Sequence, residues 1–198
     1  MTWLLDEWKR TCARAGLTAD PKLGEELVAR YHEPHRAYHT AAHLEQVLRR
    51  LEEIDAEPLL HLAAWFHDAI YVPGSPDNEI DSAKLAKREL AARGIDAASV
   101  QFVVDAILAT AGHTSSDPRL APLLDADLAT LGAPPEEYRA YVAAIRREYD
   151  KVPDELFREG RRALLREFLQ RDAIFKTVAA HQRYEAPARR NLEAELLA

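Results

Sequence analysis

The chain has 198 residues and a formal net charge of −7, with 26 Lys and Arg residues against 33 Asp and Glu. Alanine and leucine together supply 61 residues (35 and 26), whereas glycine and proline supply 18 (7 and 11). This composition favours one packed helical domain and excludes a β-sandwich, a collagen-like repeat or a disordered chain. The acidic balance also argues against a nucleic-acid polymer as partner, because such a partner requires a basic field.

The single cysteine, Cys12, excludes an internal disulfide framework and suits a reducing compartment. The N-terminal segment turns acidic at Asp6 and lacks the apolar centre of a signal peptide. No apolar run approaches the roughly 18 residues that a membrane-spanning helix needs. We therefore expect a cytoplasmic protein with no membrane partner, and no pattern in the chain indicates its oligomeric state.

Hydrophobic residues recur at helical spacing along almost the whole chain. Asp20, Thr40 and Asp96 stand where helix N-caps are expected, and proline or glycine separates most of the periodic segments. The predicted helices cover residues 3–16, 21–32, 40–54, 58–71, 78–94, 97–112 and 118–132, with later helices beginning at Pro134–Pro135, Pro153 and Pro187. The sequence thus predicts one all-α domain, residues 1–198, of about eight to ten helices.

Histidines are concentrated in one short stretch of the chain, at positions 32, 35, 39 and 43. A spacing of four residues places His35, His39 and His43 on one face of a helix. For any one of them alone, a partly solvated polar stripe is the simpler interpretation. His43 differs because it precedes Val47 by four residues and so lies at the margin of the apolar face, where an imidazole without a partner is costly.

Two carboxylates fall among apolar residues. Asp68, next to His67, lies near the end of the apolar helix predicted for 58–71, where it must be paired, capped or bound to a cation. Asp127 lies in the middle of the leucine face of the helix predicted for 118–132, whereas Asp125 points roughly 160° away from it. A satisfied cap or a buried ion pair is the structural alternative for Asp68.

A divalent cation would satisfy these groups together, because two neutral histidines and two aspartates lie close to one another in the expected fold. The predicted ligands are His43, His67, Asp68 and Asp127. Two imidazoles and two carboxylates suit Mn, Mg, Fe, Co, Ni or Zn rather than a soft-metal thiolate site. Ligands drawn from three helices leave coordination positions open for water, which is typical of catalytic metal sites. An ion held in this way activates water and polarises a phosphoryl oxygen.

The order His43, His67–Asp68 and Asp127 resembles the H…HD…D signature of the HD superfamily of metal-dependent phosphohydrolases. The string 38–43, Tyr-His-Thr-Ala-Ala-His, is similar to the Tyr-His-Asn-x-x-His motif of cyclic nucleotide phosphodiesterases, with Thr40 in place of Asn. Strings within 33–39, 78–83 and 185–192 look like a bacterial subgroup of predicted HD phosphohydrolases, and the resemblance covers roughly residues 25–195.

This resemblance implies a helical bundle of the phosphodiesterase-like type and an enzyme that hydrolyses a phosphate ester of a small molecule. A nucleotide is the expected substrate, a metal-bound hydroxide the nucleophile and His39 the general acid. The subgroup implies no defined substrate and does not distinguish monoesters from diesters. Two alternatives stay open: a nucleotide- or metabolite-sensing domain without turnover, and a non-haem iron oxygenase, which the shortage of further histidines disfavours.

Three further residues are candidates for substrate contact or catalysis. His113 could contact a substrate phosphate or a second ion, although a single metal is preferred because binuclear members usually carry two extra histidines. Glu79 could orient the attacking water, or could only favour the dipole of its helix. Arg36 could bind phosphate as a charged fork, or could form an exposed ion pair.

The remaining polar groups receive structural interpretations. His61 and His181 are expected to be structural or exposed. Arg146, Glu148 and Tyr149 form a charged run on a late helix, and such a run is more often a solvated face than part of a pocket.

Overall fold

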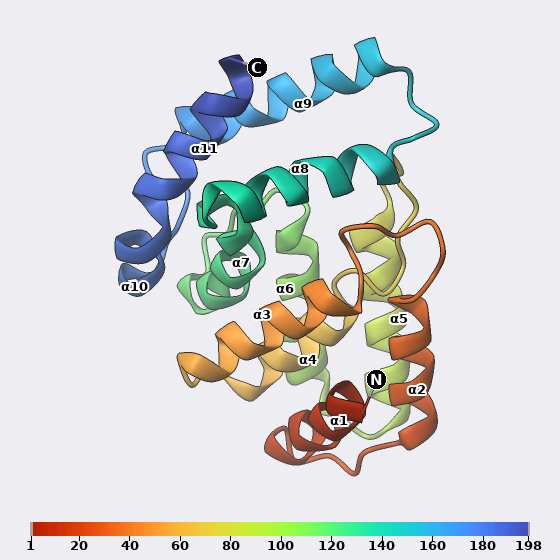
Figure 1. Ribbon diagram of the computed structural model, residues 1–198. Helices are drawn as coiled ribbons and strands as arrows, with labels where there is room; N and C mark the ends of the chain where they lie inside the picture. Colours follow the sequence, from red (N-terminus) through yellow and green to blue (C-terminus); the bar gives the residue numbers. More distant parts are fainter. Residues whose placement is uncertain (1, 198) are drawn as a thin grey trace.

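The helical periodicity of the sequence is realised along most of the chain. The computed structural model describes residues 2–197, and this range contains no β-strand (Figure 1). Its α-helices are α1 (Thr2–Arg14), α2 (Pro21–Arg30), α3 (Ala41–Glu53), α4 (Pro58–Phe66), α5 (Asn78–Ala92), α6 (Ala97–Thr110), α7 (Ala121–Leu128), α8 (Pro135–Glu148), α9 (Asp154–Gln170), α10 (Val178–Ala180) and α11 (Ala186–Leu197). The predicted single all-α domain is thus confirmed. None of the helices from residue 2 to 197 combines the length and the apolarity needed to cross a membrane.

Two of the predicted N-caps act through their side chains. The Asp20 carboxylate accepts a hydrogen bond from the backbone N–H of Lys22 (3.0 Å), and Asp96 accepts one from Ser99 (3.0 Å). Each satisfies an N–H that the first turn of a helix leaves without a partner. Thr40 precedes α3 but makes no side-chain cap bond.

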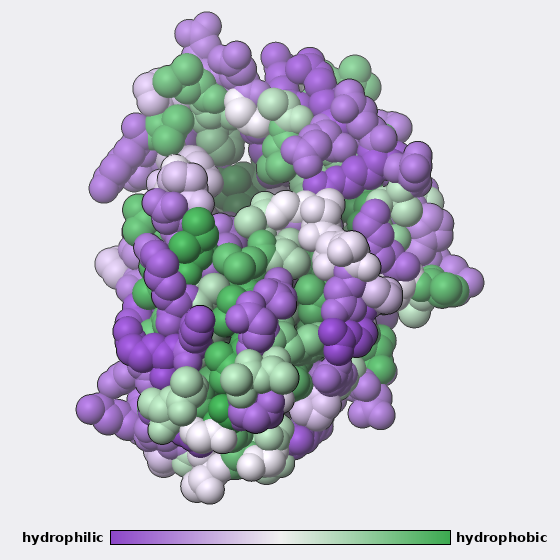
Figure 2. All heavy atoms as spheres, turned by 180° about the vertical axis from the view of Figure 1, so that it is seen from behind, coloured by the Kyte–Doolittle hydropathy of each residue, from purple (hydrophilic) through white to green (hydrophobic). Residues whose placement is uncertain are grey.

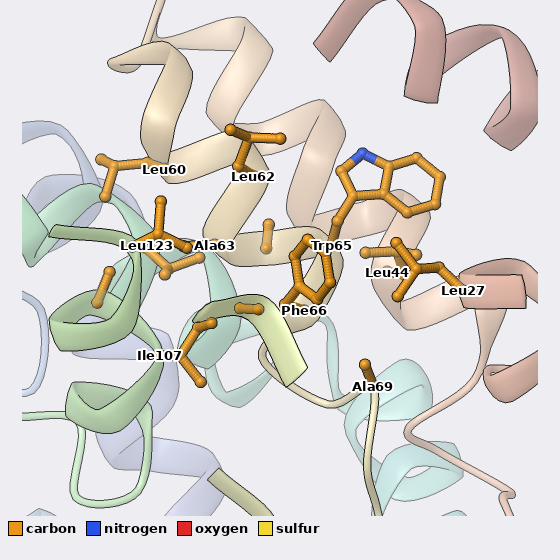
Figure 3. Packing of buried hydrophobic residues seen from close by; sticks show 14 of the residues in the cluster. Leu27, Leu44, Leu60, Leu62, Ala63, Trp65, Phe66, Ala69, Ile107 and Leu123 are labelled. Atoms are coloured by element: carbon orange, nitrogen blue, oxygen red, sulfur yellow. The ribbon is translucent and has the colours of Figure 1, made fainter. Parts of the chain in front are cut away.

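Helix α4 forms the centre of the larger hydrophobic core. Every side chain from Leu60 to Phe66 is buried. Figure 3 shows Leu27 and Leu44 from α2 and α3 on one side of this helix, and Ile107 and Leu123 from α6 and α7 on the other. Burial of each large apolar side chain contributes about 1.5–3 kcal/mol. The apolar sequence of α4 therefore fixes the position of the residues that follow its last turn.

The α4 helix ends at Phe66, five residues before the predicted end at Tyr71. Side chains from other segments satisfy the backbone of the turn that follows, so the helix need not continue to pair it. Arg36 donates to the carbonyls of two of its residues, and Ser82 and Asn78 bond to the backbone further along. Because the chain turns here, the residues after Phe66 project from the end of a helix rather than from its side.

A smaller core lies in the C-terminal part of the chain, where η2 (Ala129–Gly132), α8, α9 and α11 pack together (Figure 1). It contains Leu128, Leu131, Tyr138, Leu165, Phe168, Ile174, Phe175, Ala188 and Leu192. The two cores adjoin at α7, whose leucines contribute to both. The ends of α4, α6 and α7 and the start of α3 carry most of the predicted site residues into this region.

The last helical segment of the chain begins before Pro187, where the sequence predicts its start. Thr177 caps α10 by accepting from the backbone N–H of Ala180 (3.3 Å), and a π-helical segment, η3 (His181–Glu185), leads into α11. Pro187 stands at the second residue of α11 and so marks a continuation of the helix rather than its start. His181 is half exposed and its Nδ1 lies 3.5 Å from Oε2 of Glu185, which agrees with the structural interpretation.

His61 should make the stability of the fold depend on pH. Its side chain lies in α4 with 1% exposure, its Nδ1 has no hydrogen-bond partner, and burial lowers its pKa to about 4. Between that pH and about 6.5 the unfolded chain binds a proton that the folded chain rejects. The contribution of His61 to the free energy of unfolding is therefore complete above pH 6.5 and declines as the pH falls toward 4.

The full shift of the His61 pKa from 6.5 to about 4 corresponds to at most about 3.5 kcal/mol of unfolding free energy, because each pH unit is worth about 1.4 kcal/mol. His61→Leu should remove this component from the difference in unfolding free energy between neutral and acidic buffer. Urea unfolding of both proteins at the two pH values measures it. Identical pH dependence in the variant and the wild type would contradict the assignment.

Candidate metal centre

The four predicted ligands converge from three helix ends. His43 lies in the first turn of α3, His67 caps the C-terminus of α4 and precedes Asp68, and Asp127 lies in the last turn of α7. One donor atom from each of the first three lies within 4.8 Å of the others. Oδ1 of Asp127 is 2.9 Å from Nε2 of His43 and 3.6 Å from Nε2 of His67. The structure therefore brings all four side chains to one place.

The imidazoles are oriented as metal ligands are. Nδ1 of His67 lies 2.7 Å from the carbonyl oxygen of Ala64, which can only accept, so this nitrogen carries the proton and Nε2 presents its lone pair. Nε2 of His67 and both ring nitrogens of His43 are buried and form no well-aligned hydrogen bond, although the two Nε2 atoms lie 3.1 Å from Oδ2 of Asp68 and 2.9 Å from Oδ1 of Asp127, respectively. Buried polar atoms are almost always satisfied. Unsatisfied imidazole nitrogens beside two carboxylates fit a divalent cation.

The carboxylates are held in the charged form that a cation requires. Burial alone would raise the pKa of Asp127, but the neighbouring His67, His113 and His43 bring it well below its usual range. Burial likewise lowers the pKa of His67, and the charge of Asp68 outweighs this and raises it well above its ordinary value. The cluster therefore pairs its own charges, and a cation bound there would replace the proton on His67.

Asp125 lies apart from the four ligands, as its angular position in the helix predicts. It is buried, and its two carboxylate oxygens accept from the backbone N–H groups of Lys176 (2.8 Å) and Thr177 (2.7 Å). It fastens the segment before α10 to α7. The two aspartates of α7 thus have different surroundings although only one residue separates them.

His39 lies beside this cluster and is oriented by Glu148. Nδ1 of His39 is 2.7 Å from Oε2 of Glu148, which also accepts from the Tyr71 hydroxyl at 2.9 Å. The other oxygen, Oε1, accepts from three successive backbone N–H groups, those of residues 37, 38 and 39, at 2.7–2.9 Å. The His39 ring lies 5.8 Å from the His43 ring, centroid to centroid. Nε2 is thus the nitrogen that His39 can offer to a bound molecule.

These contacts favour the protonated form of His39. Burial lowers its pKa, but the charges of Asp68 and Glu148 outweigh that effect and raise the pKa above the ordinary value. Burial also raises the pKa of Glu148, yet the bond to His39 and the backbone donors bring it down to about 2. Both shifts favour the ionised form of the pair, which suits His39 to donate a proton.

Glu148 is the site residue that the sequence prediction missed. The expected solvated face is wrong here, since Glu148 is 4% exposed. A signal was present: Glu148 follows Tyr141, Ala144 and Ile145 at the three-four spacing of the inward face of α8. A carboxylate in such a register requires a partner, by the argument that identified Asp127.

Arg36 has a structural role in place of the predicted phosphate contact. Its side chain has no exposed surface. Nη1 donates to the carbonyls of His39 (3.0 Å) and Asp68 (2.8 Å), while Nε and Nη2 bind Glu33 and Nη2 also reaches Ala69 (3.4 Å). All five N–H donors are used. Arg36 instead ties the loop that carries His39 to the turn that carries Asp68.

His113 and Glu79 line one cleft together with His39. His113 adopts a left-handed backbone (φ +48°) just after α6, and its Nε2 lies 2.9 Å from Oδ2 of Asp127. It contacts the metal cluster through the carboxylate oxygen that faces away from His43. Glu79 is half-buried and makes no hydrogen bond or ion pair to the four ligands within the described chain.

Comparisons with protein-family models, with curated proteins and with solved structures returned no match for this chain. The resemblance to HD phosphohydrolases is therefore a prediction from the sequence motif alone.

Removal of metal should lower the thermal stability of the protein. A ligand that binds only the folded chain adds about 2.7 kcal/mol at a free concentration 100 times its dissociation constant. A chelator should therefore lower the melting temperature of the metal-loaded wild type by several degrees, and far less in Asp68→Ala, in which one carboxylate is absent. Differential scanning calorimetry measures both. An unchanged melting temperature after verified metal removal would mean that protein groups satisfy the carboxylates.

Proposed function

We propose that this protein is a metal-dependent phosphohydrolase that cleaves a phosphate ester of a small molecule. The single observation that carries the proposal is the joint arrangement of His43, His67, Asp68 and Asp127 around unsatisfied imidazole nitrogens, with His39 beside them. A structural ion-pair cluster would need no oriented histidine next to it and no cleft leading to it. This cluster has both.

The residues divide the chemistry between them. A divalent ion bound by the four ligands would supply hydroxide at neutral pH and polarise a phosphoryl oxygen. His39 donates the proton of Nε2 to the leaving oxygen, while Glu148 holds Nδ1 and stabilises the imidazolium. Tyr71 fixes Glu148 through its hydroxyl, so the proton donor is positioned by two buried side chains. His113 can contact the phosphate, because its ring borders both Asp127 and the cleft.

A metal-by-substrate screen tests this function. Purified apo-protein is combined with Mn²⁺, Mg²⁺, Fe²⁺, Co²⁺, Ni²⁺ or Zn²⁺ and with a panel of phosphomonoesters and phosphodiesters, including nucleotides. Phosphate release that requires one of the ions and is lost in His67→Ala supports the proposal. Tight binding of a panel member without any turnover would contradict it and favour a ligand-sensing domain.

A further inference from the structure

A cleft of about 490 Å³ lies between α8 and α9, and its lining includes His39 and His113 but none of the four predicted ligands themselves. His39 and His113 border it at the metal end, since the first lies beside His43 and the second contacts Asp127. Figure 2 shows a hollow in the upper part of the molecule with hydrophobic residues at its floor. A cleft of this volume holds a small organic molecule.

Beyond the metal end, the walls of the cleft are apolar and aromatic. Helix α9 contributes much of the wall, and α7, η2, α8, the segment between α8 and α9, and α11 contribute the rest. The apolar lining residues are Leu128, Leu131, Ile145, Val152, Leu156, Phe157, Leu164, Leu165, Phe168 and Leu192. Leu156 and Leu164 are 59% and 41% exposed, so both can be reached by a molecule that enters the cleft.

Most polar groups in the walls already have partners. The Thr110 hydroxyl donates to the carbonyl of Ile107 at 2.6 Å. Arg161 bonds to Glu195 at 2.8 Å and to the Tyr141 hydroxyl at 3.0 Å, so its charge is neutralised inside the protein. Among the described residues that line the cleft there is no Asn, Gln, Ser or Lys.

This chemistry does not suit a nucleotide. The edge of a nucleobase is read by amide or hydroxyl groups in fixed positions, and further phosphates need free cations. The cleft offers an uncommitted phenol from Tyr149 and no free guanidinium from Arg161. It does offer an extended apolar surface that begins next to the proton donor His39.

We infer that the substrate is a phosphate monoester of an apolar alcohol, whose hydrocarbon part lies in the cleft between α8 and α9 while its phosphate lies at the metal centre. This inference rests on the proposed function and names its substrate class. In the reaction the water oxygen forms a bond to phosphorus and the bond from phosphorus to the alkyl oxygen breaks. That oxygen takes the proton of His39, the proton lost by the water returns to His39 through solvent, and the products are inorganic phosphate and the free alcohol.

Alkylphosphonates test the inference independently of turnover, because they carry the phosphate-like head group but are not hydrolysed. Binding of methyl-, butyl- and octylphosphonate to the Mn²⁺-loaded wild type is measured by titration calorimetry. Affinity should rise about fourfold for each methylene that enters the cleft. Equal affinity across the series would overturn the inference, as would tighter binding of adenosine monophosphate than of octylphosphonate.

A matched pair of variants tests whether the dependence of affinity on chain length arises in the cleft. Leu164→Gln replaces a wall residue that is 41% exposed, and Leu108→Gln replaces a leucine of similar exposure (40%) on α6 that does not line the cleft. Leu164→Gln should lower the affinity for octylphosphonate several-fold and the affinity for methylphosphonate only slightly. Leu108→Gln should keep the wild-type dependence of affinity on chain length. The same behaviour in both variants would overturn the placement. If octylphosphonate binds as expected but no ester is hydrolysed, the proposed function fails and the assignment of the cleft stands.

Discussion

His39→Ala should keep its metal and lose roughly 100- to 10,000-fold in turnover on a phosphate ester with an alkoxide leaving group. The reason is positional: His39 lies next to His43, yet its Nδ1 bonds to Glu148 and not to the cluster. An alkoxide leaves slowly without a proton, so the loss of the donor acts on the chemical step. Steady-state kinetics together with elemental analysis measure both properties.

A substrate that needs no proton provides the control. Turnover of p-nitrophenyl phosphate, whose phenolate leaves unprotonated, should fall much less in His39→Ala. If both substrates suffer equally while the metal content stays full, His39 positions the phosphate rather than donating a proton. A fall in metal content would instead make His39 a ligand, and the set of four would be wrong.

Glu148→Gln should change the pH profile rather than abolish activity. The amide oxygen can still accept from the backbone N–H groups of residues 37–39, but the negative charge beside His39 is lost. Because that charge raises the pKa of His39, the variant should have a lower pKa there. A general acid loses activity as the pH rises through its pKa, so the alkaline limb should move to lower pH. If the alkaline side of the pH–activity profile does not move, Glu148 serves only to hold the backbone of residues 37–39.

The second large effect is expected in α7, where Asp127→Asn should lose most of the bound metal and Asp125→Asn should retain it. The two substitutions are chemically identical and lie two residues apart in one helix. Only Asp127 faces the imidazoles of His43 and His67, at 2.9 and 3.6 Å, whereas Asp125 holds the backbone before α10. Asp125→Asn should therefore cost stability, about 1–3 kcal/mol for a poorly satisfied buried donor, and not metal.

Elemental analysis of both purified variants after metal loading measures the difference, and calorimetry measures their stability. Equal metal content in Asp127→Asn and the wild type would contradict the ligand assignment. Loss of metal in both variants would mean that α7 as a whole had shifted.

Local sequence signals were sufficient for most of the helices and for the direction in which side chains on them face. Asp20 and Asp96 cap helices as predicted, because capping depends on residues within one turn. The leucine register of α7 separated Asp127 from Asp125, because a register depends only on spacing within one helix. These predictions required no knowledge of the partners across the fold.

Predictions were less accurate for residues whose hydrogen-bond partners lie far away in the sequence. The end of α4 at Phe66 is set by Arg36, Ser82 and Asn78, which bind the following turn from other segments. Arg36 looked available for phosphate because nothing local shows that its guanidinium is enclosed. Glu148 looked solvated because its partners, residues 37–39, lie more than 100 positions away in the chain. The spacing in α8 indicated that Glu148 faces inward, but periodicity does not show which distant groups a buried carboxylate binds.

The position of a bound ion tests the central claim most directly. Crystals of the protein grown with Mn²⁺, measured near the manganese absorption edge, reveal the ion by its anomalous scattering. We predict a peak on the order of 2 Å from Nε2 of His43, Nε2 of His67 and a carboxylate oxygen of each of Asp68 and Asp127. A fully occupied peak elsewhere, or none at this cluster at saturating Mn²⁺, would contradict the metal centre and with it the proposed hydrolase.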